Sequence, residues 1–292
     1  MLKPRASVVI PVHNESIYLY STVTALLNTS KIPIEIIVVD DESTDSSSSF
    51  IGRGIFRDVR LIRHKRMGSS RTRNIGAQHA HSNVLVFLDG HCVPQPDWLE
   101  RLLLVLEHHE STIVTPCIVD AMDPTSKGFG VTLENRLTDY IWLVDKRTEA
   151  PYEVPVACGA CMVMRKDVFH QLGGFDSTRT WGGEDVEICI RAWLLGHSVV
   201  VVPTVEVRHL FKEKAQFRTP CSDYIYNFLR AAILHFDGER LGRMLDDLET
   251  SPAFPEAVRL LLPSDIWERY RFVRDRRIHN GDWLCDRFDI KL

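Results

Sequence analysis

The segment SVVIPVHNE, residues 7–15, places a continuous run of apolar, mostly β-branched residues directly before polar side chains. The same order recurs in EIIVVDDES, residues 35–43, and in VLVFLDGHC, residues 84–92. Continuous apolar runs of this length predict strands buried on both faces, as in parallel sheets covered by helices. Residues 15–28 and 69–81 read as helices between these strands, so the order of elements predicts an α/β fold with a mainly parallel sheet.

Polar clusters follow each of the three predicted strands, at residues 13–15, 40–42 and 89–91. Ligands of open α/β sheets bind beyond the carboxyl ends of the strands, so we expect the three clusters to share one rim. Asp89 and His91 stand two residues apart, and an extended segment projects both to one side. A carboxylate with an imidazole suits Mn²⁺ or a similar cation. An Asp-Gly pair is also common in plain surface turns, and a metal would need a third ligand.

A second cluster, WGGED at residues 181–185, precedes a predicted helix. Two acids at a helix start have a purely structural explanation, because they stabilise the helix dipole. The two glycines favour close approach of the backbone to a ligand. An aromatic ring beside paired carboxylates is also suited to sugar binding, so this cluster is a second candidate site.

Two further motifs have weaker functional interpretations. Residues 65–74, KRMGSSRTRN, could form an anion site at a helix start, or simply a solvated basic stretch. Residues 158–161 form a solitary C-x-x-C motif, and a zinc site would need a second cysteine pair. The residues after it resemble a strand rather than the helix of a redox site, so we expect neither function.

The composition excludes several classes of protein. The 292 residues carry 35 Lys and Arg against 39 Asp and Glu, which argues against a general nucleic-acid-binding surface. No apolar run approaches the roughly 18 residues of a membrane span, and no signal peptide is apparent. Seven cysteines, an odd number, disfavour a disulfide framework. We therefore expect a soluble, cytoplasmic enzyme or binding protein with free thiols, whose oligomeric state is open.

Taken in order, these motifs resemble the family-2 glycosyltransferases of the GT-A fold, over about residues 5–212. The Asp-x-His triplet, the Trp-Gly-Gly-Glu motif and the downstream His209 are similar to the catalytic domain of the polypeptide N-acetylgalactosaminyltransferases. The resemblance implies a Rossmann-like GT-A domain over residues 1–212. The tail, residues 213–292, has helical patterning and is predicted to be a C-terminal helical extension.

The resemblance also implies roles for individual residues. The predicted ligands of a divalent cation, Mn²⁺ or else Mg²⁺, are Asp89, His91 and His209. The residues predicted to bind the nucleotide of a UDP-sugar donor are Pro11, His13, Glu15, Asp41 and Arg66, with Lys212 facing the diphosphate. Trp181 and Glu184 would line the sugar and acceptor side. The acceptor stays open between a natural product, a saccharide, a lipid and a peptide.

Asp185 bears on the stereochemistry of transfer. The N-acetylgalactosaminyltransferases have Asn at this position, whereas many inverting family-2 enzymes keep a general base there, as do the galactosyltransferases with a Gly-Gly-Glu-Asp motif. A base that deprotonates the acceptor has a direct role in inversion, so inversion with Asp185 as base is favoured. The Asp-x-His pattern is shared with retaining relatives and favours retention. The ricin-like lectin domain and the membrane anchor of those relatives have no counterpart in the sequence.

Three other functions fit the sequence less well. A non-catalytic nucleotide-sugar binder of the same fold is disfavoured by the intact set of Asp89, His91 and His209 alongside Glu184 and Asp185. A sugar-nucleotide pyrophosphorylase would carry a glycine-rich basic loop after the first strand, where this chain has PVHNES. A nicotinamide dehydrogenase would need G-x-G-x-x-G at that point. Turnover of a UDP-sugar to UDP would separate a transferase from a binder.

Overall fold

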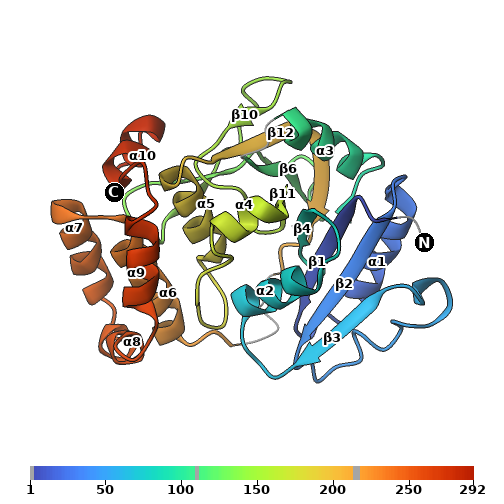
Figure 1. Ribbon diagram of the computed structural model, residues 1–292, viewed down its shortest axis with the longest axis horizontal. Helices are drawn as coiled ribbons and strands as arrows, with labels where there is room; N and C mark the ends of the chain where they lie inside the picture. Colours follow the sequence, from blue (N-terminus) through green and yellow to red (C-terminus); the bar gives the residue numbers. More distant parts are fainter. Residues whose placement is uncertain (1–2, 109–111, 213–217) are drawn as a thin grey trace.

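The computed structural model of the protein describes residues 3–108, 112–212 and 218–292. A large sheet runs through the middle of the molecule (Figure 1). Its main strands lie in the spatial order β10 (Tyr152–Glu153), β12 (Ser198–His209), β6 (Thr112–Asp120), β11 (Cys161–Arg165), β4 (Val84–Leu88), β1 (Ala6–Val12), β2 (Ile34–Asp41) and β3 (Arg60–His64). Two short strands extend it, with β5 (Cys92–Pro94) on β12 and β7 (Lys127–Gly128) on β6.

Four of the seven neighbouring pairs along the main strand order are parallel. β1 pairs in parallel with β2 and β4, β2 with β3, and β12 with β6. β11 is antiparallel to both β4 and β6, and so joins two parallel groups into one sheet. The predicted α/β class with a mainly parallel sheet is therefore confirmed.

Both faces of the sheet are buried. Along β1, Val8 and Ile10 belong to one apolar core and Val9 belongs to the other. The helices on the first core are α1 (Tyr18–Thr29), the single turn η1 (Gly54–Phe56) and α3 (Trp98–His108), and those on the second are α2 (Ser69–His79), α4 (Lys166–Gln171) and α5 (Glu184–Leu194). Burial on both sides explains why the strands read as continuous apolar runs.

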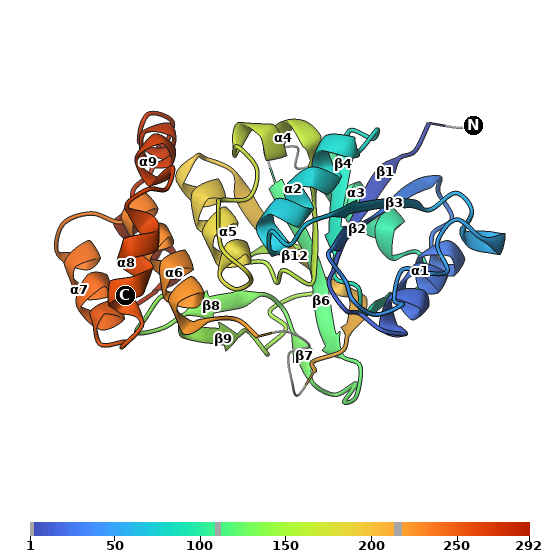
Figure 2. The ribbon, with the colours of Figure 1, turned by 90° about the horizontal axis from the view of Figure 1, so that it is seen from below.

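The last part of the chain is helical and gathers at one end of the sheet (Figures 1 and 2). It contains α6 (Cys221–His235), α7 (Gly238–Glu249), α8 (Phe254–Leu261), α9 (Ile266–Arg274) and α10 (Gly281–Phe288). Phe228 of α6 belongs to the same core as Val186 of α5. The predicted boundary at residue 212 adjoins residues 213–217, which are outside the described residues, so the boundary stays a prediction.

The segment between β7 and β10 has no readable pattern in the sequence. It contains a small two-stranded sheet of β8 (Val131–Leu133) and β9 (Tyr140–Trp142), paired antiparallel. Strands of three residues are too short to show a period. Figure 2 shows this pair below α5 and beside α6.

Two predicted elements have different limits from those expected. The helix expected from residue 15 begins at Tyr18, because Asn14 and Ser16 adopt left-handed backbone conformations with φ of 56° and 51°. The apolar run at residues 199–202, which by itself predicts a short strand, continues in β12 through a register shift to His209. The second difference matters more, since it places a histidine at the end of a strand.

Two findings bear on the environment of the chain. Across the described residues, no helix combines the length and apolar character needed to cross a bilayer. The seven cysteines all lie in the described part of the chain as free thiols, six of them buried.

Candidate functional site

The carboxyl ends of β1, β2 and β4 open into a cavity of about 470 Å³, here called the rim pocket. The predicted site residues that line it are Pro11, His13, Glu15, Asp41, Arg66, Asp89, His91, Trp181, Glu184, Asp185, His209 and Lys212. The three polar clusters expected on one rim thus meet in one cavity. The residues of this cavity therefore come from segments that are far apart in the sequence.

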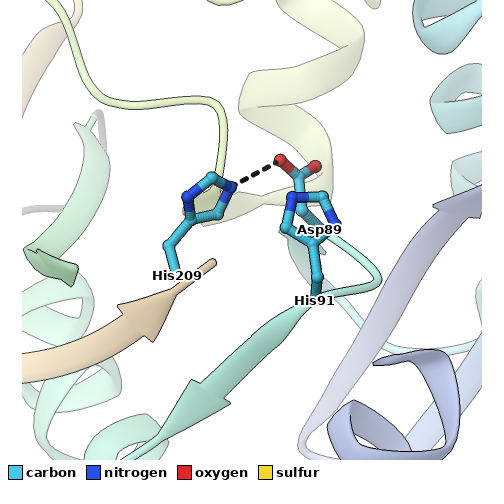
Figure 3. A group of neighbouring side chains, drawn as sticks. All are labelled: Asp89, His91 and His209. Atoms are coloured by element: carbon cyan, nitrogen blue, oxygen red, sulfur yellow. Dashed lines mark ion pairs between the residues drawn. The ribbon is translucent and has the colours of Figure 1, made fainter. Parts of the chain in front are cut away.

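Asp89, His91 and His209 point toward one another in the rim pocket (Figure 3). Each offers a ligand atom, and these atoms lie within 4.8 Å of one another. His209 Nε2 is 3.7 Å from Asp89 Oδ2. His209 reaches the other two because β12 pairs with β5, which sets His209 opposite Cys92, the residue after His91.

The surroundings of this triad fit a divalent cation. His91 Nδ1 lies 3.0 Å from Glu15 Oε2, which fixes the ring and directs Nε2 toward the other two ligands. A carboxylate behind a metal-binding imidazole is the usual outer-shell arrangement. One carboxylate and two imidazoles form a donor set suited to Mn²⁺ and similar ions.

Asp89 is held in its ionised form. Burial by itself would raise its pKa, but the neighbouring His209 imidazole and the charges of Arg73 and His91 keep that pKa well below its usual range. The carboxylate therefore carries its charge at neutral pH and is available as a ligand.

Arg73, which we did not predict as a site residue, joins the two halves of the pocket. This buried side chain of α2 donates to Asp89 Oδ1 at 2.9 Å and to Glu184 Oε1 at 2.8 Å. A buried guanidinium is tolerated when carboxylates pair with it on both sides. In the sequence, Arg73 is only one of several cations in the basic stretch at residues 65–74. Arg66 was the residue of that stretch predicted to have a functional role.

The start of α2 does not form the simple anion site considered for residues 65–74. The backbone N–H groups of Met67 and Gly68 donate to the Asp41 carboxylate at 2.7 and 3.0 Å. The Ser69 N–H donates to the Thr180 carbonyl at 2.9 Å. Because protein groups already satisfy these amides, the predicted anion contact would depend on the Arg66 side chain.

Glu184 and Asp185 open α5 after two glycines with positive φ. Glu184 accepts a hydrogen bond from Gly182 N at 2.9 Å, and Asp185 accepts one from Gly159 N at 3.1 Å. Burial and the neighbouring Glu184 charge raise the pKa of Asp185 to about 6. Asp185 is therefore a carboxylate that is mostly ionised at neutral pH yet more basic than an ordinary aspartate.

Comparison with known proteins identifies the family. Residues 7–173, more than half of the chain, match the family described as Glycosyl transferase family 2. The chain belongs to this family. Residues 144–215 of this family-2 glycosyltransferase chain also match the N-terminal domain of galactosyltransferase, in a span that includes Glu184 and Asp185.

Curated relatives share sequence over most of the chain. Polypeptide N-acetylgalactosaminyltransferase 11 of Xenopus tropicalis is 32% identical over 80% of this chain and 43% of its own length. Inactive polypeptide N-acetylgalactosaminyltransferase-like protein 5 of Macaca fascicularis is 31% identical over 80% of this chain and 58% of its own. The family-2 chain thus spans about half the length of these relatives.

The fold is also seen in solved structures. A crystal structure of GalNAc-T7 with UDP, GalNAc and Mn²⁺ superposes with a TM-score of 0.79 and 22% identity, over 98% of this chain and 56% of the other. The expected GT-A-like architecture, a mostly parallel sheet with C-terminal helices, is confirmed. The resemblance to family-2 glycosyltransferases is confirmed as well.

An aromatic wall completes the rim pocket of this family-2 chain. Besides the predicted Trp181, it contains Tyr140 and Trp142 of β9, Tyr224 of α6, and Phe211. Trp142 and Phe211 meet edge to face with ring centroids 5.8 Å apart. The sequence shows no clear pattern over about residues 120–155, a stretch that could carry a substrate loop, and it did not predict Tyr140 or Trp142 as individual site residues.

Proposed function

We propose that this chain transfers a sugar from a UDP-sugar to an acceptor hydroxyl or amine, with a divalent cation, Mn²⁺ or else Mg²⁺, held by Asp89, His91 and His209. The observation that carries the proposal is the convergence of this triad with Glu184 and Asp185 in one pocket. Family membership and the names of the relatives support the same reaction class. The N-acetylgalactosaminyltransferases act here as a guide to the donor, and peptide specificity is not carried over.

On the donor side, residues that follow the strands would bind the UDP-sugar. Pro11, His13 and Asp41 would contact the nucleotide, while Arg66 and Lys212 would face the diphosphate. The departing diphosphate gathers negative charge, and cations held close to it would stabilise that charge. The bound cation supplies Lewis-acid stabilisation of the same leaving group.

On the acceptor side, Asp185 would act as the general base. Its carboxylate accepts the proton of the acceptor hydroxyl while that oxygen bonds to the anomeric carbon. The bond from the anomeric carbon to the diphosphate breaks, UDP leaves with the electron pair, and the configuration inverts. The pKa of about 6 supports this role, since a base is most effective when its pKa is near the working pH. The galactosyltransferase match over this segment supports it too.

The domain division is part of the proposal. Residues 1–212 would form the GT-A domain, and residues 213–292 a helical extension that completes the pocket through Tyr224. Cytoplasmic location stays a prediction that rests on the sequence alone.

A turnover assay tests the proposal. The full chain is incubated with UDP-, GDP- and dTDP-sugars, with and without Mn²⁺, and nucleoside diphosphate release is measured. We expect Mn²⁺-dependent release of UDP. His209→Ala should lower it at least 100-fold, whereas His79→Ala, at an exposed position of α2, should leave it unchanged. Absence of release with every donor, despite donor binding, would support a non-catalytic binder.

The configuration of the product tests the role of Asp185. Proton NMR of the new glycosidic bond should show the anomer opposite to that of the donor. A product with the donor's configuration would support retention, the outcome that the Asp-x-His pattern favours, and would remove Asp185 from the role of base.

A further inference from the structure

Two tyrosines from separate parts of the chain meet in the rim pocket. Tyr140 lies on β9 and Tyr224 in the first turn of α6, and both line the pocket together with Asp185. Both rings pack on Phe228, with centroid distances of 5.9 Å for Tyr140 and 4.8 Å for Tyr224. The rings are therefore held in place by the hairpin and by the helical extension together.

Tyr224 is fixed further by the glycines that open α5. A Cβ atom at Gly182 would lie 3.1 Å from the Tyr224 ring, and a Cβ atom at Gly183 would lie 3.0 Å from the Phe228 ring. The absence of side chains at these two positions lets the aromatic rings approach the start of the helix that carries Asp185. The tyrosine pair thus has a defined position relative to that carboxylate.

The hydroxyls of this pair are suited to bind a ligand. Each hydroxyl is near enough to the other to shift its pKa, and within the described residues neither forms a hydrogen bond with any further side chain. Desolvation of the hydroxyl, followed by the charge of Asp185, raises the pKa of Tyr140, although the residue as a whole is 38% exposed. Desolvation also raises the pKa of Tyr224, so both hydroxyls stay protonated. Each protonated phenol can donate one hydrogen bond and accept others.

We infer that Tyr140 and Tyr224 form an acceptor subsite, and that the acceptor is a saccharide. The inference rests on the proposed function. Asp185 would accept a hydrogen bond from the hydroxyl that reacts. The neighbouring tyrosine pair would form hydrogen bonds with a second hydroxyl of the same molecule. A sugar ring carries such neighbouring hydroxyls, whereas a serine or threonine side chain carries only one.

The remaining surfaces of the subsite fit the same class of ligand. Trp142, Trp181 and Phe211 offer flat aromatic faces, which pack against the C–H groups of a sugar ring. A pocket that is largely aromatic with a few placed polar groups sets orientation through those groups. A ligand that left the two hydroxyls unpaired would lose affinity, because desolvated polar groups need partners.

The first test offers two acceptor classes to the full chain. Nitrophenyl glycosides of galactose, glucose, N-acetylgalactosamine and N-acetylglucosamine are compared with a threonine-containing peptide, using the UDP-sugar that gives UDP release. We expect transfer to at least one glycoside and none to the peptide. Transfer to the peptide alone, or release of UDP to water with every glycoside inert, would overturn the saccharide assignment. Absence of UDP release from every donor would instead be a failure of the proposed function.

The second test removes single hydroxyl groups. Tyr140→Phe and Tyr224→Phe should each raise the acceptor KM about tenfold while the donor KM changes less than about twofold. Tyr20→Phe is the matched control, because Tyr20 packs on Phe50 and Phe56 away from the pocket. With the wild type, an acceptor that lacks the second hydroxyl should show a similar increase in KM. With either variant, removing that hydroxyl from the acceptor should raise the KM little further. Equal acceptor KM values in wild type and variants would rule out the subsite, whatever the acceptor class.

Discussion

The side chain of Arg73 links the metal-binding and acceptor sides of the rim pocket. It pairs with Asp89 on the metal side and with Glu184 on the acceptor side, and it also approaches the Gly159 carbonyl at 3.4 Å. It thereby connects the loop that contacts Asp185 with the end of β4. The charges of both carboxylates raise the pKa of Arg73, although burial alone would lower it.

Replacing Arg73 by methionine should therefore harm both stability and activity. The change leaves two carboxylates in a buried place without their cation, which should reduce the free energy of unfolding by about 3 kcal/mol. Urea unfolding followed by circular dichroism measures the effect. Arg71→Met, at an exposed position of the same helix, is the control and should change stability by less than about 0.5 kcal/mol. Similar losses for both variants would contradict the role given to Arg73.

Asp185 gives a prediction about pH. A base with a pKa of about 6 becomes protonated as the pH falls through that value, so kcat/KM for the acceptor should drop about tenfold per unit below pH 6. Asp185→Asn should remove transfer and keep donor binding, which is measured by thermal shift with UDP-sugar. A pH profile that stays flat down to pH 5 would contradict assignment of Asp185 as the base.

At the scale of elements, the start of α2 requires a glycine. Gly68 precedes the helix with φ of +87°, and a Cβ atom there would lie 2.7 Å from the Thr180 carbonyl oxygen and 2.8 Å from its nitrogen. Both contacts are with backbone, so neither can rotate away. This close approach joins the start of α2 to the segment that precedes Trp181.

Gly68→Ala should consequently destabilise the protein by about 2 kcal/mol, through backbone strain and this collision. Gly242→Ala is the matched control with the opposite expected effect on stability. Gly242 is inside α7, and a Cβ atom added there would meet nothing within 4 Å. That change should stabilise by about 0.5 kcal/mol through helix propensity. Paired urea titrations test the contrast, and destabilisation by both or by neither would contradict it.

Across the whole molecule, the helical extension and the sheet are built as one packed body. Arg230 of α6 donates to both oxygens of Asp176 at 2.6 and 2.8 Å, and His235 contacts Glu187 of α5 at 2.9 Å. All four side chains are buried. Separating the extension from the sheet would leave the buried Asp176 carboxylate without the Arg230 guanidinium, and Glu187 without one of its hydrogen-bond partners. Both losses destabilise a buried carboxylate, so these contacts hold the two parts together.

The extension should therefore unfold together with the sheet. Hydrogen exchange of α6 and of β4, followed by mass spectrometry through a urea series, should show one common midpoint. Loss of protection in α6 at a clearly lower urea concentration would indicate a separately folding extension. Arg230→Met should move both midpoints downward together.

Local pattern was sufficient for several parts of this protein. The apolar runs predicted β1, β2 and β4 because a strand buried on both faces must be apolar throughout. The polar residues after them predicted the rim, and the spacing of Asp89 and His91 predicted a pair of ligands, because both follow from chain geometry within a few residues. The order of these motifs along the chain was enough to reveal the family.

Other parts depended on contacts between distant segments. Apart from the family resemblance, the sequence around His209 does not predict that it is a partner of Asp89. The two residues come together because β12 continues through its register shift and pairs with β5. Arg73 reads as one more cation of a basic stretch until burial places it between two carboxylates. Tyr140 and Tyr224 meet only because the hairpin and α6 pack on the same phenylalanine. Packing of this kind depends on which surfaces face each other in the folded chain, and a linear pattern carries no information about that.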